Sequence, residues 1–152
     1  MAVVLEKQGK LEEAIAVYRK SLDSRLKALG TDHADTAASY NNMAVVREKQ
    51  GKLEEATALY RKSLDIRLKE LGPGHAATAD TYNNMAVALQ NQGKWEEAMV
   101  LYQKALDIRL KALGPDHADT GTSYNNMAGV LENQGELEEA LTIHRKALGI
   151  RL

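Results

Sequence analysis

The sequence repeats itself every 42 residues, and this period constrains the fold more than any other feature. The segment Tyr-Asn-Asn-Met-Ala occurs three times, and other residue types recur in the same register. The recurring methionines, glycines and alanines are Met1, Met43, Met85 and Met127; Gly9, Gly51, Gly93 and Gly135; and Ala14, Ala56, Ala98 and Ala140. Similarity at a fixed period of this length indicates an array of supersecondary units, each of which stacks on its neighbours.

One repeat predicts two helices joined by short turns. Apolar side chains recur at steps of three and four over residues 35–49, which predicts a first helix there, and Gly51 is placed to end it. A second helix is expected over residues 53–71, where glutamates open the segment and basic residues close it, as suits a helix dipole. The glycine and proline of the following "GPGH" or "GPDH" segment then stop this second helix.

These two helices form a hairpin that is too small to bury its own apolar face. We therefore predict an all-α, helical-hairpin solenoid with about three and a half repeats in a single domain, residues 1–152. The predicted units are a partial repeat and three further repeats, with boundaries at 1–33, 34–75, 76–117 and 118–152. The first unit lacks the start of its first helix in this register, so we also expect the chain to be a fragment of a longer array.

Composition excludes several classes of function. Lys and Arg total 20 against 21 Asp and Glu, so no net field attracts nucleic acid or an anionic membrane, and neither is expected as a partner. The chain has no cysteine, no phosphate-binding glycine loop and no nucleophile beside a histidine. We expect no enzyme activity, no metal and no cofactor. With no signal peptide or long apolar stretch, we expect an intracellular, cytoplasmic protein.

The pattern "NNMA...QGKLEEA..LYRKSLDIRLKELGPGH" resembles the 42-residue tetratricopeptide repeats of the kinesin light chain type, and the resemblance covers the whole chain. Four residues at the family's spacing carry it: the small Ala44, the turn residue Gly51, the packing residue Ala56 and the aromatic Tyr60. The resemblance implies a right-handed superhelix that binds extended peptides or protein segments on its concave face and is not itself an enzyme.

The paired asparagines are the candidate binding residues. Each costs a helix roughly 0.5 kcal/mol relative to alanine, so a compensating role is expected. By resemblance, they lie on the face that lines the concave groove, and the second asparagine of each pair grips the ligand backbone. The second members are Asn42, Asn84 and Asn126, and the first members are Asn41, Asn83 and Asn125. The alternative is structural, with the amides bonding to the neighbouring helix.

Two further rows accompany the asparagines on this face. Val45 and Val87 form an apolar strip, and Glu48, Gln90 and Glu132 form a row near the end of each first helix. Kinesin light chains carry basic residues at several groove positions, so the acidic row here favours a neutral or basic segment over an acidic one. The alternative is that this row is only a solvated face.

Other conspicuous residues are assigned to structure. His33, His75 and His117 occur once per repeat and are expected in the loops before each first helix, too far apart for a shared metal. His144 replaces a recurring tyrosine as a packing substitution. Trp95 is assigned to the core, where other copies have leucine. The arginines at the edge of the second helix, Arg25, Arg67, Arg109 and Arg151, are expected to bond loop carbonyls.

Two functions fit these observations. The first is a scaffold that binds an extended peptide or protein segment in the groove. The alternative is a self-associating array, a homo-oligomer joined through apolar stripes at its terminal repeats. Those stripes contain Met1, Val4 and Leu5 at one end and Leu141, Leu148 and Leu152 at the other.

Overall fold

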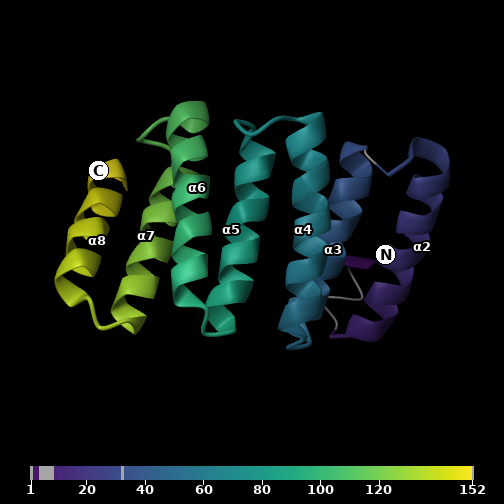
Figure 1. Ribbon diagram of the computed structural model, residues 1–152, viewed down its shortest axis with the longest axis horizontal. Coiled ribbons are helices and arrows are strands. Elements are labelled where there is room, and N and C mark those ends of the chain that lie inside the picture. The colour runs from purple at the N-terminus through teal and green to yellow at the C-terminus, as the bar shows by residue number, and fades with distance from the viewer. Residues whose placement is uncertain (1, 4–8, 32, 152) are drawn as a thin grey trace. The chain divides into compact units, whose positions relative to one another are not determined.

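The computed structural model describes residues 2–3, 9–31 and 33–151, and its described part is helical without strands (Figure 1). Two kinds of helix alternate along the chain, and we call them A and B helices. The A helices are α3 (Ala34–Lys49), α5 (Ala76–Asn91) and α7 (Ala118–Asn133). The B helices are α2 (Leu11–Leu29), α4 (Leu53–Glu70), α6 (Trp95–Leu113) and α8 (Leu137–Arg151). The predicted first and second helices are confirmed to within one residue at each end.

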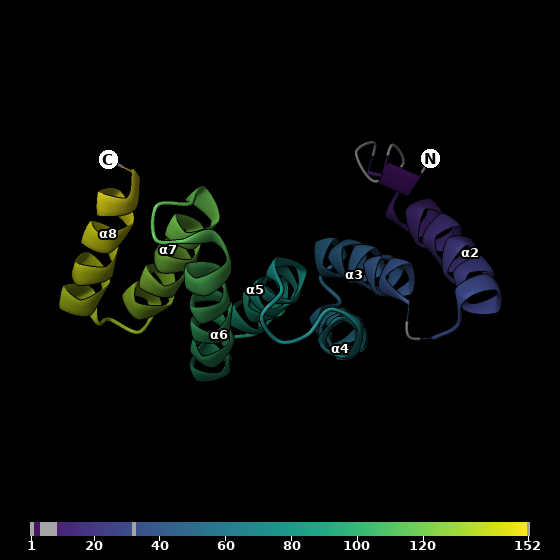
Figure 2. The same ribbon diagram turned by 90° about the horizontal axis from the view of Figure 1, so that it is seen from above.

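The chain divides into two compact units, Met1–Gly72 and Pro73–Leu152. In the first unit α3 packs against both α2 and α4. In the second unit α5 packs on α6, α6 on α7 and α7 on α8. Consecutive helices within a unit lie side by side and run in alternating directions, as both views show (Figures 1 and 2). Each A helix therefore forms a hairpin with the B helix that follows it.

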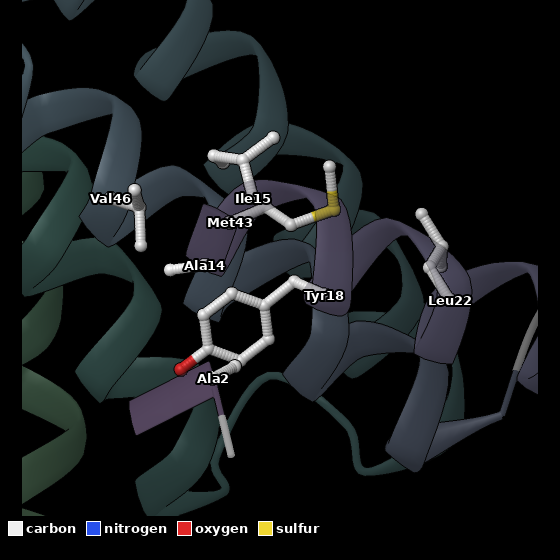
Figure 3. Packing of buried hydrophobic residues seen from close by; sticks show 7 residues of the cluster. All are labelled: Ala2, Ala14, Ile15, Tyr18, Leu22, Met43 and Val46. Atoms are coloured by element: carbon white, nitrogen blue, oxygen red, sulfur yellow. The ribbon is translucent and has the colours of Figure 1, made fainter. Parts of the chain in front are cut away.

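Small residues allow the two helices of each hairpin to approach closely. Ala44, Ala86 and Ala128 on the A helices have no exposed surface, and Ala56 and Ala98 on the B helices have none either. Around these contacts pack larger side chains of successive helices. In the first unit Ile15, Tyr18 and Leu22 of α2 meet Met43 and Val46 of α3, and the ring of Tyr18 lies beside Ala2 (Figure 3). This is the interlocking core that a repeat array requires.

The ends of each A helix are fixed by the same local bonds in every copy. His33, His75 and His117 precede the A helices, and the Nδ1 atom of each accepts a hydrogen bond of 3.0 Å from the backbone N–H two residues later. The histidines thus act as N-caps, which confirms their predicted place before the helix. At the other end Gly51 has a φ of 76°, the left-handed conformation that closes a helix, and the next N–H bonds back to Arg47 O at 2.9 Å.

Candidate functional site

The asparagine pairs lie at equivalent places on the three A helices. All six side chains, on α3, α5 and α7, are half-buried, as are the neighbouring Val45 and Val87. Half-burial leaves the amides accessible in part, which a ligand contact requires. It also brings them near neighbouring helices, to which they can bond.

One hydrogen bond joins the asparagines of adjacent A helices in the second unit. Asn126 Nδ2 on α7 donates to Asn83 Oδ1 on α5 at 2.8 Å. This is the structural use of the amides that the sequence left open as an alternative. The bond uses one N–H of Asn126 and one lone pair of Asn83 Oδ1. A side-chain amide has two N–H donors and an oxygen with two lone pairs, so each of the two amides keeps further hydrogen-bonding capacity.

The first asparagine of α7 has a different neighbour. His144 on α8 brings its Nδ1 atom to 3.3 Å from Asn125 Oδ1 and its Nε2 atom to 2.6 Å from Glu132 Oε1. The histidine that replaces a tyrosine here is therefore more than a packing substitution, because its two ring nitrogens contact two of the candidate residues on α7.

The late positions of the A helices are bonded within their own hairpins. Tyr60 OH donates to Glu48 Oε2 at 3.0 Å, and Tyr102 OH donates to Gln90 Oε1 at 2.9 Å. In the last hairpin His144 makes the corresponding contact with Glu132. The row thus connects each A helix to its B helix, a role that the sequence analysis missed. That the same row also contacts a ligand stays a prediction.

The environment of Glu48 disfavours its charge. Burial raises the pKa of Glu48 above its ordinary value, and the hydrogen bond from Tyr60 acts in the opposite direction. Gln90 makes the same bond to a tyrosine without carrying a charge. The tyrosine bond therefore requires an acceptor oxygen at this position but not a carboxylate.

We expect Glu48→Gln to stabilise the protein at neutral pH. Because the pKa of Glu48 is raised in the folded state, protonated Glu48 favours folding. This contribution to stability is fully present below the unfolded-state pKa and is lost as pH rises through the folded-state pKa. Glutamine keeps the acceptor for Tyr60 without that loss. The gain at pH 7 should be below about 1 kcal/mol, because the carboxylate is only half-buried, and it should vanish near about pH 4.

Urea unfolding of the variant and the parent at both pH values measures this gain. The reciprocal change, Gln90→Glu, should lower stability at pH 7. Equal stability of Glu48→Gln and the parent at pH 7 would show that burial of the charge has no net cost.

Two arginines of the B helices, of which Arg109 is buried and Arg25 half-buried, hold the first two turns of the next A helix. Arg109 NH1 donates to Ser123 Oγ at 2.8 Å and to Asp119 O at 3.2 Å, and Arg25 bonds in the same way to Asp35 O and Ser39 Oγ. The structural role predicted for these two arginines is confirmed, although the accepting carbonyls belong to the helix and not to the loop.

Arg109 also neutralises a carboxylate on α5. Its NH2 atom lies 3.1 Å from Asp80 Oδ1, while the Arg109 side chain is only 7% exposed and that of Asp80 is 57% exposed. Asp80 therefore compensates a buried guanidinium and still reaches solvent.

The assignment of Trp95 to the core is wrong. The side chain begins α6 with 37% of the residue's surface exposed, and it lines a cavity of about 290 Å³ together with Gln134 and the Gly93–Glu97 segment. The equivalent leucines Leu11 and Leu53 are half-buried. Leu137, at the same position of the last hairpin, is 65% exposed, so the size of the indole alone does not determine exposure here.

The expectations about a metal, a membrane and the ends of the array bear on different parts of the chain. No group of three or more potential metal-ligating side chains occurs among the described residues. In that same portion of the chain, no helix is both long and apolar enough to cross a membrane. Met1, Val4, Leu5 and Leu152, named above for the ends of the array, lie outside the described side chains, and so does Arg151.

Comparison with known proteins identifies the repeat. Residues 1–69, 35–110 and 77–152 match the family model of the tetratricopeptide repeat. The structure is similar to that of BtubC (BKLC) from P. vanneervenii, with a TM-score of 0.90 and 25% identity over 99% of this chain and 59% of that one. It is also similar to a putative kinesin light chain with nearly identical TPR-like repeats from Podosopora anserina, with a TM-score of 0.87 and 23% identity over 99% and 71% of the two chains.

The chain thus spans 59% of the length of BtubC, and no curated protein matches it. The three overlapping matches to the family model cover the chain from residue 1 to residue 152. They agree with the helical hairpins, the buried small residues and the 42-residue register described above. Tetratricopeptide repeats generally mediate protein–protein interaction or scaffolding. The chain belongs to the tetratricopeptide repeat family.

Proposed function

We propose that the chain is a scaffold that binds an extended peptide or protein segment along the asparagine-bearing face of its A helices. The observation that supports this is the Asn83–Asn126 bond between α5 and α7. It aligns two amides at the junction of neighbouring repeats and leaves Asn83 Nδ2 and Asn126 Oδ1 for other partners. One donor beside one acceptor matches a peptide unit, which presents one C=O and one N–H whatever its side chain.

The neighbouring side chains bear on what such a segment contains. Val87 lies one turn beyond Asn83 and is half-buried, so it offers apolar contact to the segment. Asp80 and Glu132 are acidic, and Asp80 is more than half exposed despite its bond to Arg109. Like charges repel, so the proposal favours a neutral or basic segment over an acidic one.

We expect Asn42→Ala/Asn84→Ala/Asn126→Ala to abolish peptide binding. Each hydrogen bond to a ligand contributes about 0.5–1.5 kcal/mol net, and ordering a flexible segment offsets much of the sum, so the parent should bind with a Kd of roughly micromolar. The measurement is fluorescence anisotropy with labelled peptides selected from a library of extended segments.

A matched control uses asparagines that lie outside the row. Asn91 and Asn133 are exposed at the ends of α5 and α7, so Asn91→Ala/Asn133→Ala should leave the Kd unchanged. Urea unfolding of both variants separates the two roles of the amides. Unimpaired binding by the triple variant, or loss of binding only together with unfolding, would contradict the proposal.

A second function, self-association, is favoured by the exposed face of α8. Leu148 is 55% exposed and Leu141 is 52% exposed. The equivalents of Leu148 in earlier hairpins, Leu22 and Leu106, are 7% and 4% exposed, because residues of the following A helix cover them. We propose that a second copy of the chain covers this face of α8, since an apolar stripe built for a helical neighbour suits another repeat.

We expect Leu141→Ser/Leu148→Ser to weaken this association at least about tenfold, because the change removes two apolar side chains from the contact. Light scattering over a concentration series measures it. Val100→Ser is the control: Val100 is 55% exposed, but its counterparts Ala16 and Ala58 are exposed as well. A parent chain that remains monomeric at high micromolar concentration would exclude self-association.

A further inference from the structure

An arginine fills the junction between successive repeats in the first unit. Arg47, near the end of α3, lies between the starts of α2 and α4, and its side chain is 12% exposed. Its Nε atom is 3.2 Å from Glu55 Oε2, and its NH1 atom donates to Gln50 Oε1 at 2.9 Å and lies 3.8 Å from Glu12 Oε1.

Two more contacts complete this junction. Gln50 Nε2 donates to Glu12 Oε1 at 2.6 Å, and Lys52 Nζ lies 3.8 Å from the same oxygen. One guanidinium and one ammonium are therefore balanced by two glutamates, with a glutamine amide between them.

The second unit keeps the acceptors of this junction and lacks both cations. The counterparts of Glu12, Gln50 and Glu55, which lie 84 residues later, are Glu96, Gln134 and Glu139. The arginine position is Leu131, and the lysine position is Glu136. Where the first unit has two positive and two negative side chains, the second therefore has three negative ones.

A cavity lies at this junction of the second unit. Its volume is about 290 Å³, and it is lined by Gly93, Lys94, Trp95, Glu96, Glu97 and Gln134. Trp95 replaces the leucine of the other repeats here and adds an aromatic ring, the surface on which a guanidinium stacks. Lys94 is the one cation of the lining, and the carboxylates of Glu96 and Glu97 outnumber it.

We propose that this cavity, which we call the Trp95 pocket, binds the guanidinium of an arginine residue from a partner protein. The guanidinium stacks on Trp95, pairs with Glu96 and donates to Gln134. Of these three, Glu96 and Gln134 are the counterparts of Glu12 and Gln50, which lie beside Arg47. In the first unit, the equivalents of Glu96 and Gln134 contact the guanidinium of Arg47, which supports the same use of these two acceptors here. The Trp95 pocket is formed at the turns that precede α6 and α8, so it is independent of the asparagine-bearing face.

Trp95 supplies a direct readout, because it is the single tryptophan of the chain. Its indole N–H gives one resolved cross-peak in a ¹H–¹⁵N spectrum. Titration of the whole chain with N-acetyl-arginine amide should shift that peak with a Kd of about 1 mM, as a few solvent-accessible contacts allow. The uncharged isostere N-acetyl-citrulline amide should leave the peak in place.

Two charge-matched variants locate the site. Glu136→Lys restores the lysine of the first unit and should raise the Kd about fivefold or more. Glu138→Lys makes the same change in net charge at the counterpart of Glu12 and Glu96 on α8, a position that does not line the pocket, and should change the Kd less than about twofold. Leu131→Arg should restore the guanidinium of Arg47 and abolish the titration.

The proposal is overturned if about 20 mM N-acetyl-arginine amide does not move the indole peak, or if the citrulline compound moves it equally. Equal effects of Glu136→Lys and Glu138→Lys would also overturn it, because the shift would then report net charge only. The last comparison involves exposed positions and does not depend on whether Leu131→Arg folds.

Discussion

Replacing Arg109 with alanine should lower the free energy of unfolding by about 2–4 kcal/mol. Arg109 is a buried charged residue that holds Ser123 Oγ, the carbonyl of Asp119 and the carboxylate of Asp80. Removing the guanidinium leaves Ser123, which has no exposed surface, without this donor, and it separates α6 from the first turn of α7. The loss should appear as a lower urea midpoint measured by circular dichroism.

Three further variants show whether this loss is specific. Ser123→Ala removes one of the bonds and should cost only about 1 kcal/mol. Arg109→Lys keeps a charge but cannot form the fork to Ser123 and Asp80, so it should recover little. Arg145 is exposed on α8, and Arg145→Ala should stay within about 0.5 kcal/mol of the parent. If Arg109→Ala is no less stable than Arg145→Ala, the arginine does not join the repeats.

Replacing Tyr102 with alanine should cost about 3–5 kcal/mol. The side chain is 1% exposed and packs with Ala86, Leu89, Leu106 and Met127, so its removal opens a cavity between α6 and its neighbours. Such a loss is a large fraction of the stability of a domain. Denaturant unfolding followed by circular dichroism measures it.

Tyr102→Phe separates the ring from the hydroxyl. It keeps the ring and removes the hydroxyl that donates to Gln90, so it should cost about 1 kcal/mol. Equal losses for the two variants would place the energy in the hydroxyl, and a loss below about 1 kcal/mol for Tyr102→Ala would show that the ring does not contribute to the core as described.

The helices were predictable because local chemistry repeats at a fixed period. The turn glycines such as Gly51 and the apolar stripes mark both ends and the inner face of each helix, and the structure confirms the bounds. The histidine caps were placed correctly before the helix, although their bonding to the backbone was not predicted. These features depend on residues only a few positions apart, so a single sequence contains them.

Features that depend on helix spacing were harder to predict. The Asn83–Asn126 bond joins residues 43 positions apart, and whether an amide reaches its neighbour depends on how closely α5 and α7 approach. The bonds of Glu48 to Tyr60 and of Gln90 to Tyr102 were missed, although their separation of 12 residues recurs in each hairpin and offered a signal.

Trp95 shows a different limit. Its position in the repeat was correctly aligned with leucines, but the alignment does not say whether a larger ring is enclosed or projects outward. In the structure Trp95 is 37% exposed, and Leu137, at the same position of the last hairpin, is 65% exposed. Burial at one position of the register thus differs between repeats, because it depends on the neighbouring helices as well as on the residue.

The central claim, that asparagine amides bind the backbone of an extended segment, is tested most directly by changing that backbone. The tightest-binding library peptide is resynthesised with single ester bonds in place of its amides, which removes one N–H donor at a time and weakens the carbonyl acceptor. Affinity of each ester peptide is then measured for the parent and for Asn126→Ala. We predict that one ester position weakens binding to the parent about tenfold and has no effect on Asn126→Ala, because the two changes remove the same bond. Ester peptides that bind the parent as well as the all-amide peptide at every position would contradict the claim.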